Sequence, residues 1–298
     1  MHKTIRELEN YMVLANYSTA TRKSYVSAAK NFFKWCVRHQ NDPDFDKSQA
    51  HRMYLVARSK KGLAWQTVNG DYSAIRMLYT KVLEREWDMK KTPRPRKEKY
   101  LPTILSQEQI KQLIDHGTMF KHQFFMLLVY STGLRLSEAL NLKLENINPE
   151  RLQVHVQRGK GNKGRYIVLP PSLVPILEAY LEYYHPKDYL FNGKYRGSRW
   201  SNRAAQECIN MAIEKGNLPR SISAHTLRHC YATHHLEKGT DLFTLQKQMG
   251  HKHLKTTARY VHLCTKHFQQ IKHPVNELCL RLKHTNSEIY LGSMESSS

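Results

Sequence analysis

The chain has 298 residues, and 47 Lys and Arg against 25 Asp and Glu give it a formal net charge of +22. So large an excess of positive charge is typical of a protein that binds a polyanion such as nucleic acid. Hydrophobic residues make up 40% of the chain, which excludes global disorder. Charge alone leaves open a basic protein without catalytic activity, such as a ribosomal protein.

The cysteines are odd in number and scattered, and none forms a CxxC pair: Cys36, Cys208, Cys230, Cys264 and Cys279. This usage indicates reduced thiols, so we expect a cytoplasmic protein. No apolar run approaches the roughly 20 residues that a membrane helix needs. The amino-terminal MHKTIRELENYMVL is an amphipathic helical pattern with acidic residues rather than a signal peptide. We therefore expect no membrane partner.

Residues 1–89 show helical patterns without a strand signal. Residues 18–21 offer N-cap side chains before a periodic stretch that contains Tyr25, Phe32 and Cys36. Two further helical patterns lie near residues 47–58 and 65–86. The sequence predicts a small unit of four helices.

The composition changes at residues 90–99, KKTPRPRKEK, which hold six basic residues, one acid and two prolines. Proline and dense charge disfavour a packed element, so we predict an exposed basic linker over residues 90–100. A plain hinge is one interpretation. In so basic a protein we favour a linker that also contacts DNA phosphates, through Lys90, Lys91, Arg94, Arg96 and Lys97.

A second, mixed region begins at Leu101. Ser106-Gln-Glu-Gln is a typical helix start, and residues 123–130 form an apolar helical run that ends in the turn Ser131-Thr132-Gly133. Residues 152–157 alternate with a period of two and residues 165–169 form a second apolar run. The sequence RGKGNKG at 158–164 lies between them and predicts a hairpin with a cationic tip.

The pattern from Pro171 to about Leu282 is helical again. Residues 284–298 are polar, and we predict a flexible tail there.

Arg135 stands in TGLRLSEAL, directly after a glycine turn and at a predicted helix start. A helix start favours anions, and a guanidinium can grip two oxygens of one phosphate. The alternative is an ordinary salt bridge to Glu138.

The run HTLRH at residues 225–229 places His225 and Arg228 three residues apart, on one helix face. Together they offer a proton-transfer group beside a phosphate-binding group, although a solvated basic face has the same pattern. Gly250 is a predicted C-cap for a helix over 242–249, so His251 projects from the following turn. Tyr260, one of 17 tyrosines, would by itself be assigned to the core.

Together these segments resemble the signature of the tyrosine recombinases, the phage integrase family. The resemblance rests on Arg135 in TGLRLSE, on HTLRH at 225–229, on MGH at 249–251 and on Tyr260 in ARYVHL. The spacing of nine positions between His251 and Tyr260 is also similar. The hairpin tip GKGNKGR resembles the loop that carries the family's catalytic lysine, which by position is Lys160, with Lys163 as the alternative.

Within the family the compact length resembles Xer-type and integron-type enzymes. The stretch between Tyr184 and Asn202 lacks the long insertion of integron integrases, which argues against that subgroup. Met249 departs from the leucine usual at its position, a packing change of small cost.

The resemblance covers the whole chain and implies a mainly α fold with a small β-hairpin or sheet (α+β). It implies a helical core-binding (SAM-like) domain that binds DNA over residues 1–89, the basic linker over 90–100, a catalytic domain over 101–283 and the tail over 284–298.

The resemblance also implies a mechanism. Tyr260 attacks a DNA phosphodiester and forms a 3′-phosphotyrosine, Arg135 and Arg228 clamp the non-bridging oxygens, and Lys160 protonates the departing 5′-oxygen. A free tyrosine has a pKa of about 10, so holding a phenolate at pH 7 costs roughly 4 kcal/mol, and such an attack needs help.

His225 is implied to accept the tyrosine proton or to position the phosphate, and His251 to hydrogen-bond the same phosphate. Lys163 and Arg165 are expected to contact DNA.

The resemblance implies no metal and no nucleotide cofactor. The 17 histidines suggest a metal site, but no spacing matches HExxH or a Cys/His zinc site. The Gly159–Arg165 loop fails the P-loop pattern because Arg165-Tyr166 replaces Lys-Ser/Thr and a strand follows.

The implied partner is double-stranded DNA with paired recombination sites, bound by a homotetramer that passes through a Holliday junction. We favour a mobile-element integrase. The segment near 268–282 is expected to pack either on a neighbouring protomer or on its own domain. Two alternatives remain: a type IB topoisomerase-like enzyme, and a degenerate recombinase that binds DNA without cutting it.

Overall fold

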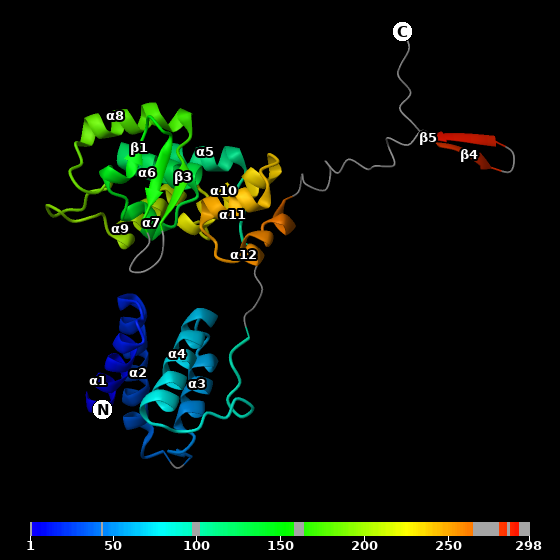
Figure 1. Ribbon diagram of the computed structural model, residues 1–298. Helices are drawn as coiled ribbons and strands as arrows, with labels where there is room; N and C mark the ends of the chain where they lie inside the picture. Colours follow the sequence, from blue (N-terminus) through cyan, green and yellow to red (C-terminus); the bar gives the residue numbers. More distant parts are fainter. Residues whose placement is uncertain are drawn as a thin grey trace, which may run out of the picture. The chain divides into compact units, whose positions relative to one another are not determined.

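The computed structural model describes residues 2–42, 44–96, 102–157 and 164–264 in full, and the backbone alone of 280–284 and 287–291. The chain divides into two compact units, residues Met1–Tyr100 and Leu101–Ser298 (Figure 1). The predicted DNA-contact residues Lys97 and Lys163, the predicted acid Lys160 and residues 268–279 lie outside the described residues.

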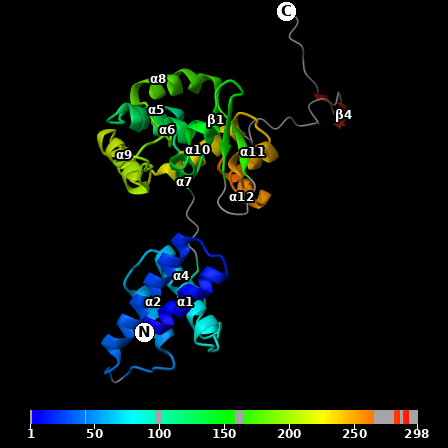
Figure 2. The same cartoon turned by 60° about the vertical axis from the view of Figure 1, so that its left-hand side comes forward.

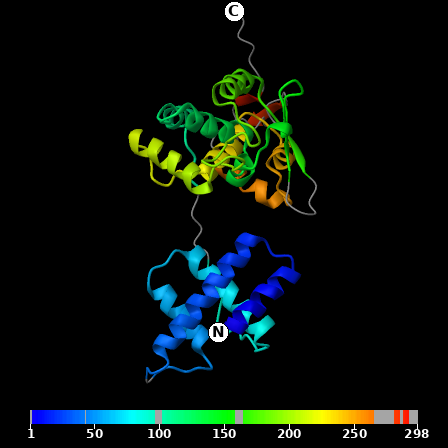
Figure 3. The same ribbon diagram turned by 90° about the vertical axis from the view of Figure 1, so that its left-hand side faces the viewer.

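The first unit is helical, as predicted. Helix α2 packs against α1, α3 and α4 (Figure 3). The core of this unit includes Leu8, Phe32 and Ile75. The predicted N-cap is present, because the backbone N–H of Thr21 donates to the Ser18 hydroxyl over 3.2 Å. The helices are α1 (His2–Leu14), α2 (Thr19–His39), α3 (Ala50–Lys60) and α4 (Trp65–Met77), followed by a π-helical turn η1 (Leu78–Val82).

The helical pattern expected to reach residue 86 ends earlier. Glu84 has a φ of 51°, in the left-handed region that a right-handed helix cannot contain. The reversal brings Trp87 back over the unit, where its ring meets Tyr72 edge-on at 5.3 Å and Tyr79 at 5.8 Å. Burial of this large aromatic side chain outweighs continuation of the helix.

The segment predicted as an exposed linker is held against the first unit at least as far as Pro95. The indole N–H of Trp65 donates to the Pro95 carbonyl over 3.0 Å, and the Arg94 guanidinium donates to Asn69 over 2.8 Å. Thr92 is 4% exposed. The prediction of an exposed linker is therefore wrong for residues 90–95. Their hydrogen bonds to Trp65 and Asn69 hold the backbone on the first unit despite the prolines and the dense charge. The basic side chains of this segment are nonetheless exposed: Lys90, Lys91, Arg94 and Arg96.

The second unit combines helices with a three-stranded antiparallel sheet in the order β1-β2-β3. The predicted hairpin pairs Val154 with Ile167 and Val156 with Arg165. Helix α10 packs against α6, and α11 lies against β3 (Figures 1 and 2). The elements are α5 (Gln107–Asp115), α6 (Phe120–Thr132), α7 (Leu136–Leu140), η2 (Leu144–Asn146), β1 (Ile147–Asn148), β2 (Gln153–Val156), β3 (Arg165–Val168), η3 (Pro171–Leu173), α8 (Val174–Tyr184), α9 (Asn202–Lys215), α10 (Ala224–Glu237), α11 (Leu242–Met249), α12 (Leu254–Ala258) and η4 (Val261–Leu263).

Local signals set the ends of several of these helices. Ser106 and Gln109 form a capping box at the start of α5. Gly133 ends α6 with a φ of 62°, and a Cβ added there would lie 2.4 Å from the Tyr231 ring, so both the backbone and the space require glycine. Gly250 ends α11 in the same left-handed conformation, as predicted.

The carboxy-terminal prediction needs correction. Strands β4 (Leu280–His284) and β5 (Ser287–Leu291) pair antiparallel where a helix to Leu282 and a flexible tail from 284 were expected. In the sequence Leu280 and Leu282 alternate with basic residues, a period of two that favours a strand. The predicted helical stretch is also interrupted between Tyr184 and Asn202, where only isolated bridges occur.

The four described cysteines, Cys36, Cys208, Cys230 and Cys264, are free thiols. No helix in the described part of the chain is both long and apolar enough to cross a membrane.

Candidate active site

Arg228 is the centre of the site and is held by the segments that end α6 and α11. It projects from α10 and is 1% exposed. Its guanidinium donates to the carbonyl of Gly133 and, over 2.7 Å, to that of Met249, and it lies 3.0 Å from His251 Nε2. Burial and the neighbouring Arg135 lower the pKa of Arg228 to about 10, which leaves it protonated at neutral pH. The cation is thereby fixed in position before any ligand arrives.

Arg135 is the N-cap residue of α7, and its side chain is 38% exposed. Its Nη1 donates to Glu138 over 2.8 Å, and its Nη2 is 3.5 Å from the Gly250 carbonyl. The salt bridge to Glu138 considered as an alternative is therefore real. It does not exclude phosphate binding, because the exposed guanidinium keeps other donors available.

Glu138 is the anion that organises the cations of this site. Its carboxylate accepts two hydrogen bonds of 2.9 Å from Arg165 and one of 2.9 Å from the backbone N–H of Arg135, and it lies 3.9 Å from Arg228 Nη1. Burial by itself would raise the pKa of Glu138, but the hydrogen bonds and charges of Arg165 and Arg135 outweigh it and lower the pKa to about 2. The sequence interpretation treated Glu138 only as a partner of Arg135. Its position as the one acid of TGLRLSE, among predicted phosphate-binding arginines, was the available signal.

Arg165 lies inside the unit rather than on a free DNA-facing surface. It begins β3, and its side chain is 10% exposed. Besides the two bonds to Glu138, its Nε donates to the Gln248 carbonyl over 2.9 Å. The prediction that Arg165 contacts DNA is not supported by this geometry, since its guanidinium nitrogens are already engaged by the protein. Its place at the base of the hairpin ties β3 to α7 and α11.

His251 follows the C-cap of α11, as predicted. Its Nε2 faces Arg228, which can only donate, so Nε2 accepts and the ring proton is on Nδ1, 2.8 Å from the Thr257 hydroxyl. Burial, Arg228 and Arg135 lower the pKa of His251 to about 4. The ring is neutral at pH 7 and has a defined orientation.

Tyr260 lies between α12 and η4 and is 1% exposed. Its ring stacks on His251 at 6.3 Å, and Arg259 lies over its face at 5.6 Å. Its hydroxyl is 2.8 Å from Nδ1 of His229, a residue to which the sequence interpretation gave no role. The signal available was that His229 lies next to Arg228 and one helical turn after His225. His225 is exposed, and its ring centroid is 4.3 Å from that of His229.

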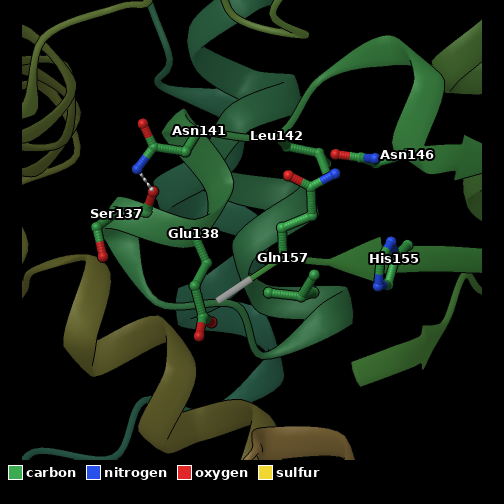
Figure 4. Close-up of a pocket in the computed structure, with 8 residues that line it drawn as sticks. Ser137, Glu138, Asn141, Leu142, Asn146, His155 and Gln157 are labelled. Atoms are coloured by element: carbon green, nitrogen blue, oxygen red, sulfur yellow. Dashed lines mark hydrogen bonds between the residues drawn. The ribbon is translucent and has the colours of Figure 1, made fainter. Parts of the chain in front are cut away.

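A pocket of about 410 Å³ has Glu138 in its lining, together with polar and apolar side chains. Figure 4 shows the residues that line it. Ser137, Glu138 and Asn141 of the α7 segment line one side, and Asn146, His155 and Gln157 line the other. Asn141 is held by the Ser137 carbonyl over 2.7 Å. The lining residues His155, Val156 and Gln157 are at the end of β2, shortly before Lys160 in the sequence.

The structure thus brings five of the six predicted catalytic residues into one region, and Lys160 lies outside the described residues. Contacts join Arg135, Arg228, His251 and Tyr260, and His225 joins them through His229. Lys90, Lys91, Arg94 and Arg96 belong to the first unit. The described residues contain no group of three or more His, Cys, Asp or Glu arranged to hold a metal.

Comparison with known protein families agrees with these motifs. The phage integrase family matches residues 103–267, which is more than half of the chain. The chain belongs to the phage integrase family. The amino-terminal SAM-like domain of phage integrases matches residues 5–89.

Curated relatives extend over most of the chain. A putative integrase/recombinase y4qK of Sinorhizobium fredii is 32% identical over 255 residues, which cover 85% of this chain and 82% of that protein. The tyrosine recombinase XerC of Staphylococcus epidermidis is 30% identical over 283 residues, which cover 90% of this chain and 95% of that protein. This chain is thus a tyrosine recombinase, an enzyme that cuts and rejoins DNA. The family predicted from the motifs is confirmed.

Solved structures share the fold at lower identity. A XerH site-specific recombinase bound to its difH substrate aligns with a TM-score of 0.67 at 21% identity, over 83% of this chain and 78% of that one. A lambda integrase dimer bound to a core site aligns with a TM-score of 0.69 at 16% identity, over 87% and 76%. The predicted fold, mainly α with a small sheet, is confirmed.

Proposed function

We propose that this tyrosine recombinase exchanges strands between paired sites on double-stranded DNA, as a homotetramer that passes through a Holliday junction, in the service of a mobile element. The observation that carries the proposal is the convergence of Arg135, Arg228 and His251 beside Tyr260. The relative from Sinorhizobium fredii is itself named an integrase/recombinase, which supports a mobile-element role.

In the proposed cleavage step, the Tyr260 oxygen attacks the scissile phosphorus and the bond to the 5′-oxygen breaks. Arg135 and Arg228 bind the two non-bridging oxygens, where negative charge accumulates in the transition state. Loss of one such preorganised donor typically costs about 3 kcal/mol. His251 donates a hydrogen bond to the same phosphate, and Lys160 protonates the 5′-oxygen, with Lys163 as the alternative acid.

The resulting 3′-phosphotyrosine conserves the phosphoester bond. A 5′-hydroxyl from another strand then attacks it and releases Tyr260, so the chain needs no nucleotide to reseal the DNA. Because the side chain is 1% exposed in the free protein, cleavage requires local movement that opens Tyr260 to the phosphate.

DNA affinity is proposed to come from both units. In the first, Lys90, Lys91, Arg94 and Arg96 are exposed and contact phosphates, and Lys97 is assigned the same role. In the second unit, Lys163, which lies between β2 and β3 in the sequence, is also assigned to contact phosphates. The cytoplasmic location expected from the cysteine usage stays a prediction.

Covalent trapping tests the proposal. Wild type and Tyr260→Phe are mixed with labelled, nicked duplexes tiled across the DNA that flanks the gene, and adducts are resolved in SDS. The control is Tyr180→Phe, since Tyr180 is also 1% exposed but bonds the Leu190 carbonyl on the α8 side of the unit. We expect an adduct with wild type and Tyr180→Phe and none with Tyr260→Phe.

An adduct that persists in Tyr260→Phe would refute the assignment of the nucleophile. DNA binding by wild type without an adduct on any fragment would favour the degenerate, binding-only alternative. A single-duplex reaction that relaxes supercoils without joining two sites would favour the topoisomerase-like alternative.

A further inference from the structure

Two histidines one helical turn apart on α10 occupy different environments. His229 is 9% exposed, and its Nδ1 lies 2.8 Å from the Tyr260 hydroxyl. His225 is exposed, and its ring meets that of His229 at an interplanar angle of 70°. The Tyr260 oxygen is therefore in contact with the buried histidine, while the exposed histidine, His225, is open to solvent.

His229 is neutral, so a ring nitrogen can accept a hydrogen bond from the nucleophile, but its surroundings weaken it as a base. Burial, followed by the charges of His225, Arg259, Arg228 and His251, lowers the pKa of His229 to about 3. The ring is neutral at physiological pH. Because a phenol O–H is a stronger donor than a neutral imidazole N–H, we assign the ring proton to Nε2, and the Tyr260 hydroxyl then donates to Nδ1.

We propose that His229 receives the Tyr260 proton during DNA cleavage, and that His225 acts on the phosphate instead. The inference deepens the proposed recombinase function and rests on it. As the oxygen–phosphorus bond forms, the phenolic proton moves to Nδ1 of His229, and the bond from phosphorus to the 5′-oxygen breaks. The 5′-oxygen takes its proton from a separate acid, so His229 ends as an imidazolium. In the resealing step the proton returns to the tyrosine oxygen.

The surroundings of His229 make its basicity depend on DNA. The groups that face it are His225 and Arg228 on the same helix, His251 after α11, and Arg259 before the nucleophile. All are cationic or able to become so, and each disfavours a proton on His229. A bound phosphate brings negative charge among them and favours the protonated ring. Proton transfer to His229 is thus coupled to the arrival of the scissile phosphate.

The test uses the full-length protein and the duplex that traps the wild-type adduct. Single-turnover cleavage is measured for wild type, His229→Leu, His229→Asn and His225→Asn, each with tyrosine or with 3,5-difluorotyrosine at position 260. The fluorinated phenol is more acidic and depends less on a base. Asparagine at 229 preserves a hydrogen-bond acceptor that cannot carry the proton away, so it separates holding the hydroxyl from deprotonating it. Thermal unfolding and DNA binding are measured for each variant.

We expect both His229 variants to slow cleavage about 100-fold or more, the usual contribution of a general base. Difluorotyrosine should restore at least about tenfold of this loss, and should restore little in His225→Asn. A 5′-bridging phosphorothiolate, whose sulfur leaves without a proton, should not rescue the His229 variants because they lack a base and not an acid.

Two results would overturn the inference. If His229→Asn cleaves at the wild-type rate, the residue only holds the hydroxyl. If difluorotyrosine rescues His225→Asn and not the His229 variants, the proton goes to His225. Failure of the recombinase proposal is distinguishable, because wild type itself would then form no adduct. If His229→Leu does not fold, His229→Asn still tests whether His229 acts as a base. The pH–rate profiles of wild type with tyrosine and with difluorotyrosine at position 260 then provide the second measurement. A base role predicts that fluorination alters the profile.

Discussion

The guanidinium of Arg165 grips the carboxylate of Glu138 through two hydrogen bonds of 2.9 Å each. This pair joins the first residue of β3 to α7, where Arg135 caps the helix. Arg165 is five positions after Lys160, so the chain that leaves the loop with the proposed acid is anchored to the carboxylate that also holds Arg135, the proposed phosphate-binding arginine. Bidentate pairs of this kind fix geometry as well as charge.

Glu138→Gln should destabilise the second unit and slow cleavage. The Glu138 side chain is 13% exposed and neutralises buried cations, and removal of one partner of such a pair costs about 3 to 5 kcal/mol. The matched control is Asp115→Asn, which breaks the pair with Lys111, whose side chains are 52% and 78% exposed, at a cost under about 1 kcal/mol. Urea unfolding measures both, and equal losses would contradict the role given to Glu138.

Arg165→Ala and Arg96→Ala should differ in the salt dependence of DNA binding. Each phosphate contact contributes about 0.9 to the slope of log affinity against log salt concentration. Arg96 is exposed, so its loss should reduce the slope by about one contact. Arg165 is engaged by Glu138 and Gln248, so its loss should lower stability and leave the slope unchanged. Fluorescence anisotropy over a salt series checks this, and a reduced slope in Arg165→Ala would restore it as a DNA contact.

The stability of the second unit should fall as the pH drops below about 6.5. The pKa values of His229 and His251 are lowered to about 3 and about 4, so between these values and 6.5 the unfolded chain binds more protons than the folded one. The contribution of the two neutral histidines to the free energy of unfolding is complete above pH 6.5 and is lost toward pH 3. The contribution of ionised Glu138 is lost only below its ordinary pKa of 4.5.

Hydrogen exchange of α10 amides at about pH 7.5 and about pH 5, corrected for intrinsic rates, measures this loss. His229→Asn should flatten the dependence because the replacement does not titrate. An unchanged dependence in that variant would contradict the assignment to His229.

Gly133→Ala should destabilise the unit by about 3 kcal/mol or more. Alanine in the left-handed region costs about 1 to 2 kcal/mol, and overpacking against the Tyr231 ring adds to it. The control is Gly239→Ala, with a φ of 84° and nothing within 4 Å of the added carbon, which isolates the backbone cost. Thermal unfolding compares the two. Because the Gly133 carbonyl also accepts from Arg228, only Gly133→Ala should slow cleavage beyond its loss of folded protein.

Much of the local structure could be predicted from the sequence. The Ser18 cap, the Ser106 capping box, the Gly133 and Gly250 helix ends and the paired hairpin strands all depend on residues close together in the chain. The motifs also indicated the family, because residue types at short, fixed spacings are visible without a structure.

What the sequence by itself determined was therefore the helical first unit, the hairpin, the family and the candidate residues of the site. Only the tertiary structure decided which atoms meet. Arg165 was expected at the DNA and instead binds Glu138, 27 positions earlier, and Tyr260 contacts His229, 31 positions earlier. Pro95 docks on Trp65 because its half-buried carbonyl accepts a hydrogen bond from the Trp65 indole. Hydrophobic periodicity and capping residues predict where a single helix or strand lies and which of its faces is buried. The partner of a charged or titratable side chain depends on how distant elements pack, and burial in that packing then sets its pKa.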